Sequence, residues 1–152
     1  MNLLATNEKQ YIIFKLNNEL HGIDISYIDS IIVMQKITRI PKSQSHYKGV
    51  INLRGDIVPV MSLRLKFGKE EEEYTSASRI IIVRPEPQAA PVGLIVDQVL
   101  EVVNLDTKDI DKISYEGNAK KVDYNIGIGK HGNDLVSLLN VKAIVLEDIL
   151  VN

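Results

Sequence analysis

The sequence predicts an all-β protein built from two small lobes, and three observations carry this prediction. Isoleucine and valine, which favour strands, make up about a quarter of the 152 residues. The apolar runs are short, and turn signals separate them roughly every ten residues, as in small barrels or sandwiches. The same order of elements also occurs twice along the chain, as a hairpin, a short helical or twisted segment and a second hairpin.

The internal repeat is visible in two pairs of segments. Gly22-Ile23-Asp24-Ile25 matches Gly93-Leu94-Ile95-Val96 at an offset of 71 residues. Asp56-Ile57-Val58 matches Asp134-Leu135-Val136 at an offset of 78 residues. A seven-residue insertion within residues 107–125 would reconcile the two offsets. Duplication of one lobe explains this pattern, and chance similarity between short hairpins is the alternative.

The first half begins with an apolar strand over residues 11–16 and a polar turn at residues 17–19. A corresponding strand over residues 79–84 and a proline-rich turn at residues 85–91 open the second half. After the first hairpin a short helix is predicted, with Ser26 near its start, because apolar residues recur at the spacing of one helix face. These residues are Ile25, Ile28, Ile31 and Ile32.

Three further helices are predicted from capping signals. Ser62 can cap a short helix that ends at Gly68, because its hydroxyl accepts from a free amide and glycine tolerates the left-handed exit. Asp106, with a second acid three residues later, resembles a capping pair. Asn140 can start a terminal helix that runs through Leu150. The apolar face of this helix consists of Val141, Ile144, Val145 and Ile149.

The two lobes are expected to be intertwined and to form one domain over residues 9–150, in approximate halves 9–70 and 76–150. A lobe of about 70 residues buries too little apolar area to be stable alone. The lobes should therefore share a hydrophobic seam, with a groove along it. Residues 1–10 contain no apolar signal segment, and no apolar run is long enough to span a membrane. We therefore expect a cytoplasmic protein without direct membrane insertion.

Charge and composition exclude several classes of partner. The net charge is −2, so no global field attracts nucleic acid or anionic lipid. Aromatic residues are 5% of the chain and tryptophan is absent, which argues against a stacking platform for single-stranded nucleic acid. Cysteine is absent, which excludes disulfides and thiolate chemistry. Residues 36–69 carry eight lysines and arginines against one acid, and four glutamates follow at residues 70–73 as an expected solvated loop.

The sequence contains no set of residues with the spacing of a known catalytic site. Residues 127–132 match the G-x-G-x-x-G pattern by letters, but a strand-like segment follows where a dinucleotide site requires a helix. His21, His46 and His131 lack the spacing of a metal site, and we expect all three in surface turns. No G-x-S-x-G nucleophile motif occurs. The sequence therefore predicts no enzymatic activity, no metal and no cofactor.

Arg54 is the candidate recognition residue. It lies in an Arg-Gly-Asp turn between two short apolar runs, which is a hairpin signature. Because Leu53 and Ile57 make the base of the turn apolar, Arg54 is expected to be partly desolvated and rigidly held, as suits recognition. The alternative is a surface ion pair with Asp56 or Glu19, which would contribute only about 0–1 kcal/mol.

The run from Gly49 to Pro59, continuing into Ser62-Leu63-Arg64, resembles the signature of the CheW family of bacterial chemotaxis coupling proteins. The resemblance extends over roughly residues 9–150, and the combination is far more specific than any one segment. Ser62 stands where the family often has aspartate, and serine caps a helix about as well. The other matching segments are residues 11–32, 40–41, 47–49, 92–99, 127, 135–138 and 140.

This resemblance implies two SH3-like five-stranded β-barrels that share a hydrophobic seam. It also implies a non-enzymatic scaffold that joins the cytoplasmic tips of methyl-accepting chemoreceptors to the regulatory domain of the histidine kinase CheA. Similar domains occur in CheA and CheV, but this chain has no room for a kinase or a receiver domain. The implied protein is monomeric when isolated and is recruited to membrane-associated receptor arrays.

The resemblance also implies which residues meet the partners. Receptor helices bind between the lobes in this family, and the kinase binds a separate side. The implied receptor-binding residues are Arg54, Ile28, Ile81 and Val99, and the implied kinase-binding residues are Gly49 and Ile57. Two alternatives stay open: an adaptor of this type in another two-component pathway, and a small β-barrel that binds a ligand in the groove between its lobes.

Overall fold

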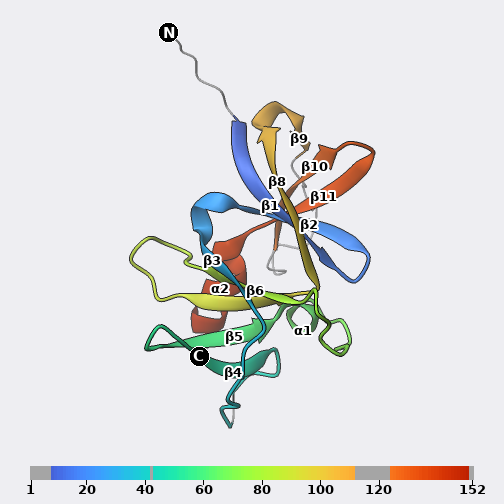
Figure 1. Ribbon diagram of the computed structural model, residues 1–152. Coiled ribbons are helices and arrows are strands. Elements are labelled where there is room, and N and C mark those ends of the chain that lie inside the picture. The colour runs from blue at the N-terminus through green and yellow to red at the C-terminus, as the bar shows by residue number, and fades with distance from the viewer. Residues whose placement is uncertain (1–7, 42, 112–123, 151–152) are drawn as a thin grey trace.

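The protein is made of two β-sheets, one above the other in Figure 1, in a computed structural model that describes residues 8–41, 43–111 and 124–150. The six-stranded sheet has the order β8-β1-β2-β11-β10-β9, and the five-stranded sheet has the order β3-β6-β7-β5-β4. The six strands are β1 (Glu8–Leu16), β2 (Glu19–Asp24), β8 (Gln98–Asp106), β9 (Ile110–Asp111), β10 (Asn125–His131) and β11 (Asp134–Leu139). The five strands are β3 (Ile28–Val33), β4 (Tyr47–Leu53), β5 (Asp56–Ser62), β6 (Arg79–Val83) and β7 (Val92–Val96). The helical segments are η1 (Ile25–Tyr27), α1 (Leu63–Lys66), η2 (Thr107–Asp109) and α2 (Val141–Leu150). The predicted all-β class is confirmed.

The pairing of strands confirms the internal repeat. Val60 of β5 pairs with Gly93 of β7, and Leu138 of β11 pairs with Gly22 of β2, both in parallel. These two pairs are related by the same offsets of 78 and 71 residues that the sequence shows. The strands β1, β2, β3, β4 and β5 therefore correspond to β6, β7, β8, β10 and β11, and each sheet has the same order of corresponding strands.

Each sheet takes strands from both halves of the chain. The six-stranded sheet contains β1 and β2 from the first half together with β8 to β11 from the second. The strand β3 leaves the first hairpin and pairs with β6 in the other sheet, while β8 crosses back to pair with β1. Local sequence patterns reveal the order of strands but not this exchange, because the exchange depends on long-range pairing.

In each sheet the chain that leaves one edge strand continues to the opposite edge. After β3 the chain reaches Thr38, which forms two backbone hydrogen bonds of 2.8 Å with Val50 of β4, at the opposite end of the same sheet. After β8 the chain enters β9 through η2, and β9 pairs with β10. In each sheet the chain that leaves one edge strand therefore pairs with a strand at or near the opposite edge, which covers part of the exposed sheet edge.

The buried apolar side chains form a core inside each sheet and a third cluster between the sheets. The core of the six-stranded sheet is Tyr11, Ile13, Val103, Leu105, Val136 and Leu138. The core of the five-stranded sheet is Ile51, Val58, Val60, Ile80, Ile82 and Ile95. The seam cluster is Phe14, Leu16, Ile23, Met61, Leu63, Ile81, Val83, Val92, Leu94, Val96, Leu139, Val141, Ile144 and Val145. Because both sheets and α2 contribute to this third cluster, the predicted hydrophobic seam is confirmed.

Two equivalent glycines let the sheets close tightly. An added Cβ at Gly22 would lie 3.0 Å from Leu138 Cδ2, and one at Gly93 would lie 2.7 Å from Ile80 Cγ2. Each glycine sits where β2 or β7 meets its parallel neighbour. A side chain at either position would displace core residues, which is why the motif that begins with glycine occurs in both halves.

The short helix predicted over residues 25–32 is wrong. Asp24 caps a single 3₁₀ turn, η1, by accepting a hydrogen bond from the Ser26 amide, and β3 then begins at Ile28. Partly buried and exposed residues alternate along β3, which is the two-residue period of a strand. The four isoleucines fit a helix face, but their β-branched side chains and the available pairing with β6 favour the strand.

The other capping predictions hold to different extents. Ser62 caps α1 by accepting from the Leu65 amide at 3.3 Å, and Gly68 follows with a φ of 77°. Asn140 accepts from the Ala143 amide at 3.1 Å at the start of α2. Asp106 caps only the 3₁₀ turn η2. Most of the expected insertion at residues 107–125, and the side chain of Ile149, lie outside the described residues.

Within the described parts of the chain, no helix has both the length and the apolar character that crossing a membrane requires.

Candidate interaction surfaces

The β4–β5 hairpin holds Arg54 in a fixed backbone geometry. The turn has two central residues, Arg54 with a φ of 54° and Gly55 with a φ of 90°, and positive φ at both positions is typical of a type I′ turn. The side chain of Asn52 accepts a hydrogen bond of 2.9 Å from the Gly55 amide and braces the turn. An arginine in the left-handed region is uncommon and costs roughly 1 kcal/mol or more. The sequence predicted the hairpin but not this strain.

Arg54 is exposed in the isolated chain, so the expectation of partial desolvation is wrong. Leu53 is partly buried against the five-stranded core, while Ile57 is 66% exposed, so no apolar wall encloses the guanidinium. Among the described residues, no ion pair or hydrogen bond of the Arg54 side chain is present, which excludes the alternative pairs with Asp56 and Glu19 there. The side chain is therefore free to meet a partner.

Gly49 shapes this hairpin from inside. It is buried with a φ of 142°, and an added Cβ would lie 2.1 Å from the carbonyl oxygen of Thr38. The register of β4 against β5 shifts between Tyr47 and Gly49, which is a bulge. Gly49 is thus positioned to set the path of β4 under the segment that follows β3, and it offers no accessible side chain to a partner.

Ile28, Ile81 and Val99 meet at one apolar cluster, although they come from different elements. Ile81 is fully buried in the seam cluster, and Ile28 of β3 and Val99 of β8 pack against that cluster while remaining partly exposed. Ile28 and Val99 are equivalent in the repeat, since they are 71 residues apart. Ile81 therefore supports this surface from below, and only Ile28 and Val99 can touch a partner.

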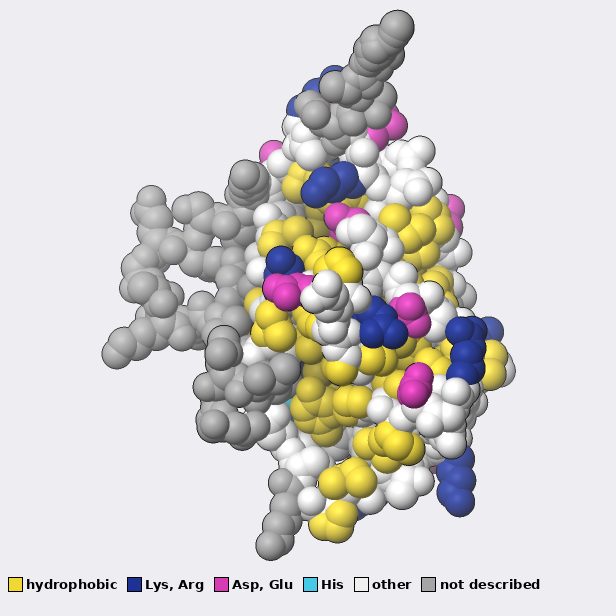
Figure 2. Space-filling model, turned by 90° about the vertical axis from the view of Figure 1, so that its left-hand side faces the viewer, with side chains coloured by type: hydrophobic (Ala, Val, Ile, Leu, Met, Phe, Trp, Pro, Cys, Tyr) yellow, Lys and Arg dark blue, Asp and Glu magenta, His cyan; other side chains and the backbone are white. Residues whose placement is uncertain are grey.

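Further apolar side chains on β3 and β8 are exposed, and the sequence analysis did not assign them. They are Ile31, Val33, Leu100 and Val102, with exposed fractions from 36% to 60%. Figure 2 shows one face of the molecule on which hydrophobic side chains cover a broad area with scattered charges. Apolar patches of this kind are typical of protein–protein contact sites. Once the segment over residues 28–33 is assigned to a strand, its alternation would have identified Ile31 and Val33 as outward positions.

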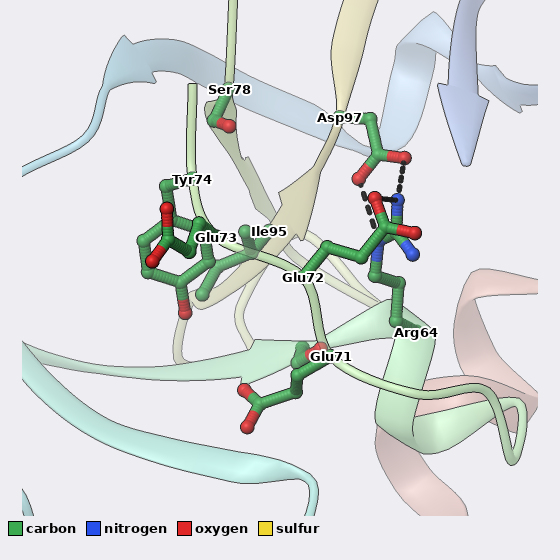
Figure 3. A pocket seen from close by; sticks show the side chains of 9 residues that line it. Arg64, Glu71, Glu72, Glu73, Tyr74, Ser78, Ile95 and Asp97 are labelled. Atoms are coloured by element: carbon green, nitrogen blue, oxygen red, sulfur yellow. Dashed lines mark hydrogen bonds and ion pairs between the residues drawn. The ribbon is translucent and has the colours of Figure 1, made fainter. Parts of the chain in front are cut away.

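Arg64 and Asp97 form a network where α1 meets the link between β7 and β8 (Figure 3). The Arg64 guanidinium donates to both carboxylate oxygens of Asp97, at 2.9 Å from Nε and 2.5 Å from Nη2. Asp97 also accepts from the backbone amide of Asn17 at 2.7 Å. This hydrogen bonding raises the pKa of Arg64 above its usual value. The network ties the β1–β2 turn of one sheet to α1 of the other, and the sequence analysis gave neither side chain a role.

His21 is buried, so its expected place in a surface turn is wrong. Only 5% of the residue is exposed, and its ring lies 5.7 Å from that of Phe14 and 6.0 Å from that of Phe67. Neither ring nitrogen has a hydrogen-bond partner among the described residues, and Nε2 is 3.7 Å from a Glu19 carboxylate oxygen. Burial lowers the pKa of His21 below its ordinary 6.5, with Glu19 opposing and Lys69 adding to this effect.

Replacing His21 with leucine is expected to remove part of the acid sensitivity of folding. Because the folded chain binds the His21 proton less readily than the unfolded chain, this residue lowers stability as the pH falls below about 6.5. Its stabilising contribution is complete above that pH. Urea unfolding of both proteins from about pH 7.5 to about pH 5 would measure the effect. If the two stability curves run parallel, His21 does not couple folding to pH.

The described residues contain no group of side chains arranged as in a catalytic or metal-binding site. No group of three histidine, aspartate or glutamate side chains there could hold a metal ion. The cavity beside Arg64 has a volume of about 20 Å³, room for roughly one water and far below the size of a ligand pocket. The glycines of residues 127–132 lie in β10 and in the turn to β11, as the hairpin interpretation predicted.

Comparisons with known proteins agree with this architecture. The family model described as "CheW-like domain" matches residues 10–148. Chemotaxis protein CheW of Helicobacter pylori is 34% identical over 139 residues, covering 91% of this chain and 82% of that protein. Chemotaxis protein CheW of Bacillus subtilis is 34% identical over 143 residues, covering 93% and 89%. The crystal structure of scaffolding protein TtCheW from Thermoanaerobacter tengcongensis superposes with a TM-score of 0.77 at 33% identity, covering 86% of this chain and 88% of that one. The chain therefore belongs to the CheW family of chemotaxis scaffold proteins.

Proposed function

We propose that this chain is a non-enzymatic adaptor that couples the cytoplasmic tips of chemoreceptors to the regulatory domain of the histidine kinase CheA. Membership of the CheW family supports an adaptor role. The observation that carries the proposal is Arg54, a guanidinium that is exposed, fixed in a strained turn, and without an intramolecular partner among the described residues. A strained residue held by its surroundings is typical of a functional position.

The receptor side of this proposal uses Arg54 together with Ile28 and Val99, which Ile81 supports from the core. The kinase side uses Ile57 on the outer face of the β4–β5 hairpin, with Gly49 setting the shape of that hairpin. Ile57 is the most exposed of the large hydrophobic residues described, at 66%, which suits an apolar contact. Two separate surfaces on one rigid body allow the adaptor to hold both partners at once.

Such an adaptor works through geometry rather than through tight binding. Each contact would bury about 800 Å² per partner, so single affinities would be modest. Many such contacts in an array raise the effective concentration and stabilise the assembly. A change in the receptor reaches the kinase if the bridge makes different contacts in the two receptor states. The proposal places the protein in the cytoplasm, as a monomer when isolated, at membrane-associated receptor arrays.

A reconstituted mixture of a receptor tip fragment, CheA and this chain tests the proposal. Receptor control of kinase activity should require the chain, and Ile57→Ser should weaken binding to the CheA regulatory domain by about tenfold, because a central apolar contact is lost. The matched control is Leu135→Ser, at the equivalent position of β11, where 62% of the residue is exposed. Receptor control without the chain would refute the adaptor role. Equal weakening by both substitutions would refute the assignment of the kinase side.

A further inference from the structure

Two of the four glutamates at residues 70–73, here called the acidic strap, form ion pairs with basic side chains of the body, although all four residues are exposed. Glu71 pairs with Lys48 at the start of β4, with 2.5 Å between carboxylate oxygen and ammonium nitrogen. Glu72 pairs with Arg64 at 3.3 Å, and the carbonyl of Glu70 accepts from the same guanidinium at 3.4 Å. Figure 3 shows the Glu72 side chain extending from the strap toward Arg64, which lies beside Asp97. The expected solvated loop is therefore confirmed, and it also makes two surface ion pairs with the body.

The strap is held weakly. Its side chains stay largely in water, since Glu71 is 42% and Glu72 is 70% exposed. A solvent-exposed pair of this kind changes an equilibrium by about fivefold at most. The small cavity between the strap and the side chains beneath it indicates loose packing. Arg64 keeps its two hydrogen bonds to Asp97 when the strap leaves, so release of the strap exposes basic groups without breaking the fold.

The basic groups that the strap occupies adjoin the proposed partner-binding hairpin. Lys48 directly precedes Gly49 on β4, the strand that leads to Arg54. Residues 36–69 carry eight cations and one acid, and the strap follows them immediately in the sequence. A body whose Lys48 and Arg64 pair with Glu71 and Glu72 in cis has the charge to bind an acidic segment of another protein in trans.

We infer that the acidic strap is a displaceable competitor, which occupies Lys48 and the outer edge of Arg64 until an acidic segment of a protein partner takes its place. The inference rests on the proposed adaptor function, because the partner that it admits is the CheA regulatory domain, which the proposal places on the outer face of the β4–β5 hairpin. The partner can dock only while the strap is released. Its apparent affinity therefore falls in proportion to the fraction of molecules in which the strap is released. The strap also discriminates against weakly acidic partners, which cannot displace it.

The double variant Glu71→Gln/Glu72→Gln tests this inference. This variant should bind the CheA regulatory domain about fivefold to tenfold more tightly at low salt, and the gain in affinity should shrink at high salt. The matched control is Glu70→Gln/Glu73→Gln, which changes net charge equally but removes neither of the two ion pairs. Adding Lys48→Gln to the first variant should cancel most of the gain. Equal gains in both double variants would show a general charge effect and overturn the inference.

A second measurement separates this inference from the adaptor proposal. A synthetic peptide with the sequence of residues 69–75 is added to the Glu71→Gln/Glu72→Gln protein and followed by NMR. The amide signals near Lys48 and Arg64 should shift in this variant at millimolar peptide and should shift less in the wild type, where the strap competes. Absence of any shift at Lys48 would overturn the strap inference while leaving the adaptor proposal intact. Failure of the wild type to bind either the receptor tip fragment or the CheA regulatory domain would refute the adaptor proposal. A peptide-induced shift at Lys48 would still support the contact between the strap and the body.

Discussion

Replacing Arg54 with asparagine is expected to stabilise the fold and to weaken receptor binding at the same time. Asparagine tolerates positive φ, and Asn-Gly is the preferred pair for a type I′ turn, so the free energy of unfolding should rise by about 0.5–1 kcal/mol. The loss of the guanidinium should lower affinity for a receptor tip fragment by about 100-fold, if an acidic receptor site buries it. Urea unfolding and calorimetric titration measure the two effects.

The opposite signs of these effects make the test decisive. A substitution that weakens binding through misfolding would lower both quantities, whereas Arg54→Asn should raise one and lower the other. Lys130→Asn is the matched control, because Lys130 is an exposed cation near the end of the β10–β11 hairpin. Arg54→Glu should weaken binding further and leave folding nearly unchanged. If Arg54→Asn binds the receptor within about threefold of the wild type, Arg54 has no role in recognition.

Those parts of the fold that depend on local pattern could be predicted from the sequence. The sequence of a few neighbouring residues was enough to recognise the caps Ser62 and Asn140 and the Arg54-Gly55 turn. Caps and tight turns are set by local hydrogen bonds and by allowed φ values. The repeat was also visible, since equivalent glycines meet equivalent strands. The exchange of β3 and β8 between the sheets was not visible, because pairing over such separations leaves no local mark.

The candidate site was predicted less completely than the fold, for a similar reason. Exposure depends on which neighbours surround a side chain, and a single sequence does not place them. His21 looked like a turn residue beside a glycine, yet the ring of Phe67, the C-cap residue of α1, packs against it. Arg54 looked partly enclosed, yet the twist of its hairpin leaves it in solvent. Ile81 matched a family position at the expected groove, yet it is fully buried in the seam cluster.

Replacing Gly49 with alanine is expected to cost more than about 3 kcal/mol of folding free energy, the largest effect on stability that we predict. The added methyl group would lie 2.1 Å from the carbonyl oxygen and 2.7 Å from the carbonyl carbon of Thr38, and backbone atoms cannot rotate away as side chains can. The two hydrogen bonds between Thr38 and Val50 would have to break or lengthen. Thermal and urea unfolding measure the loss.

Gly55→Ala separates the two causes that act together at Gly49. Gly55 also has a positive φ, at 90°, but an added Cβ would meet nothing within 4 Å, so only conformational strain of about 1 kcal/mol is expected. Near-equal stability of the two variants would mean that close packing of Thr38 against β4 is unimportant. If Gly49 acts through the shape of the hairpin, loss of kinase binding by Gly49→Ala should follow the unfolded fraction as temperature changes. Loss of binding by the fully folded variant would instead assign the glycine backbone a direct contact with the kinase.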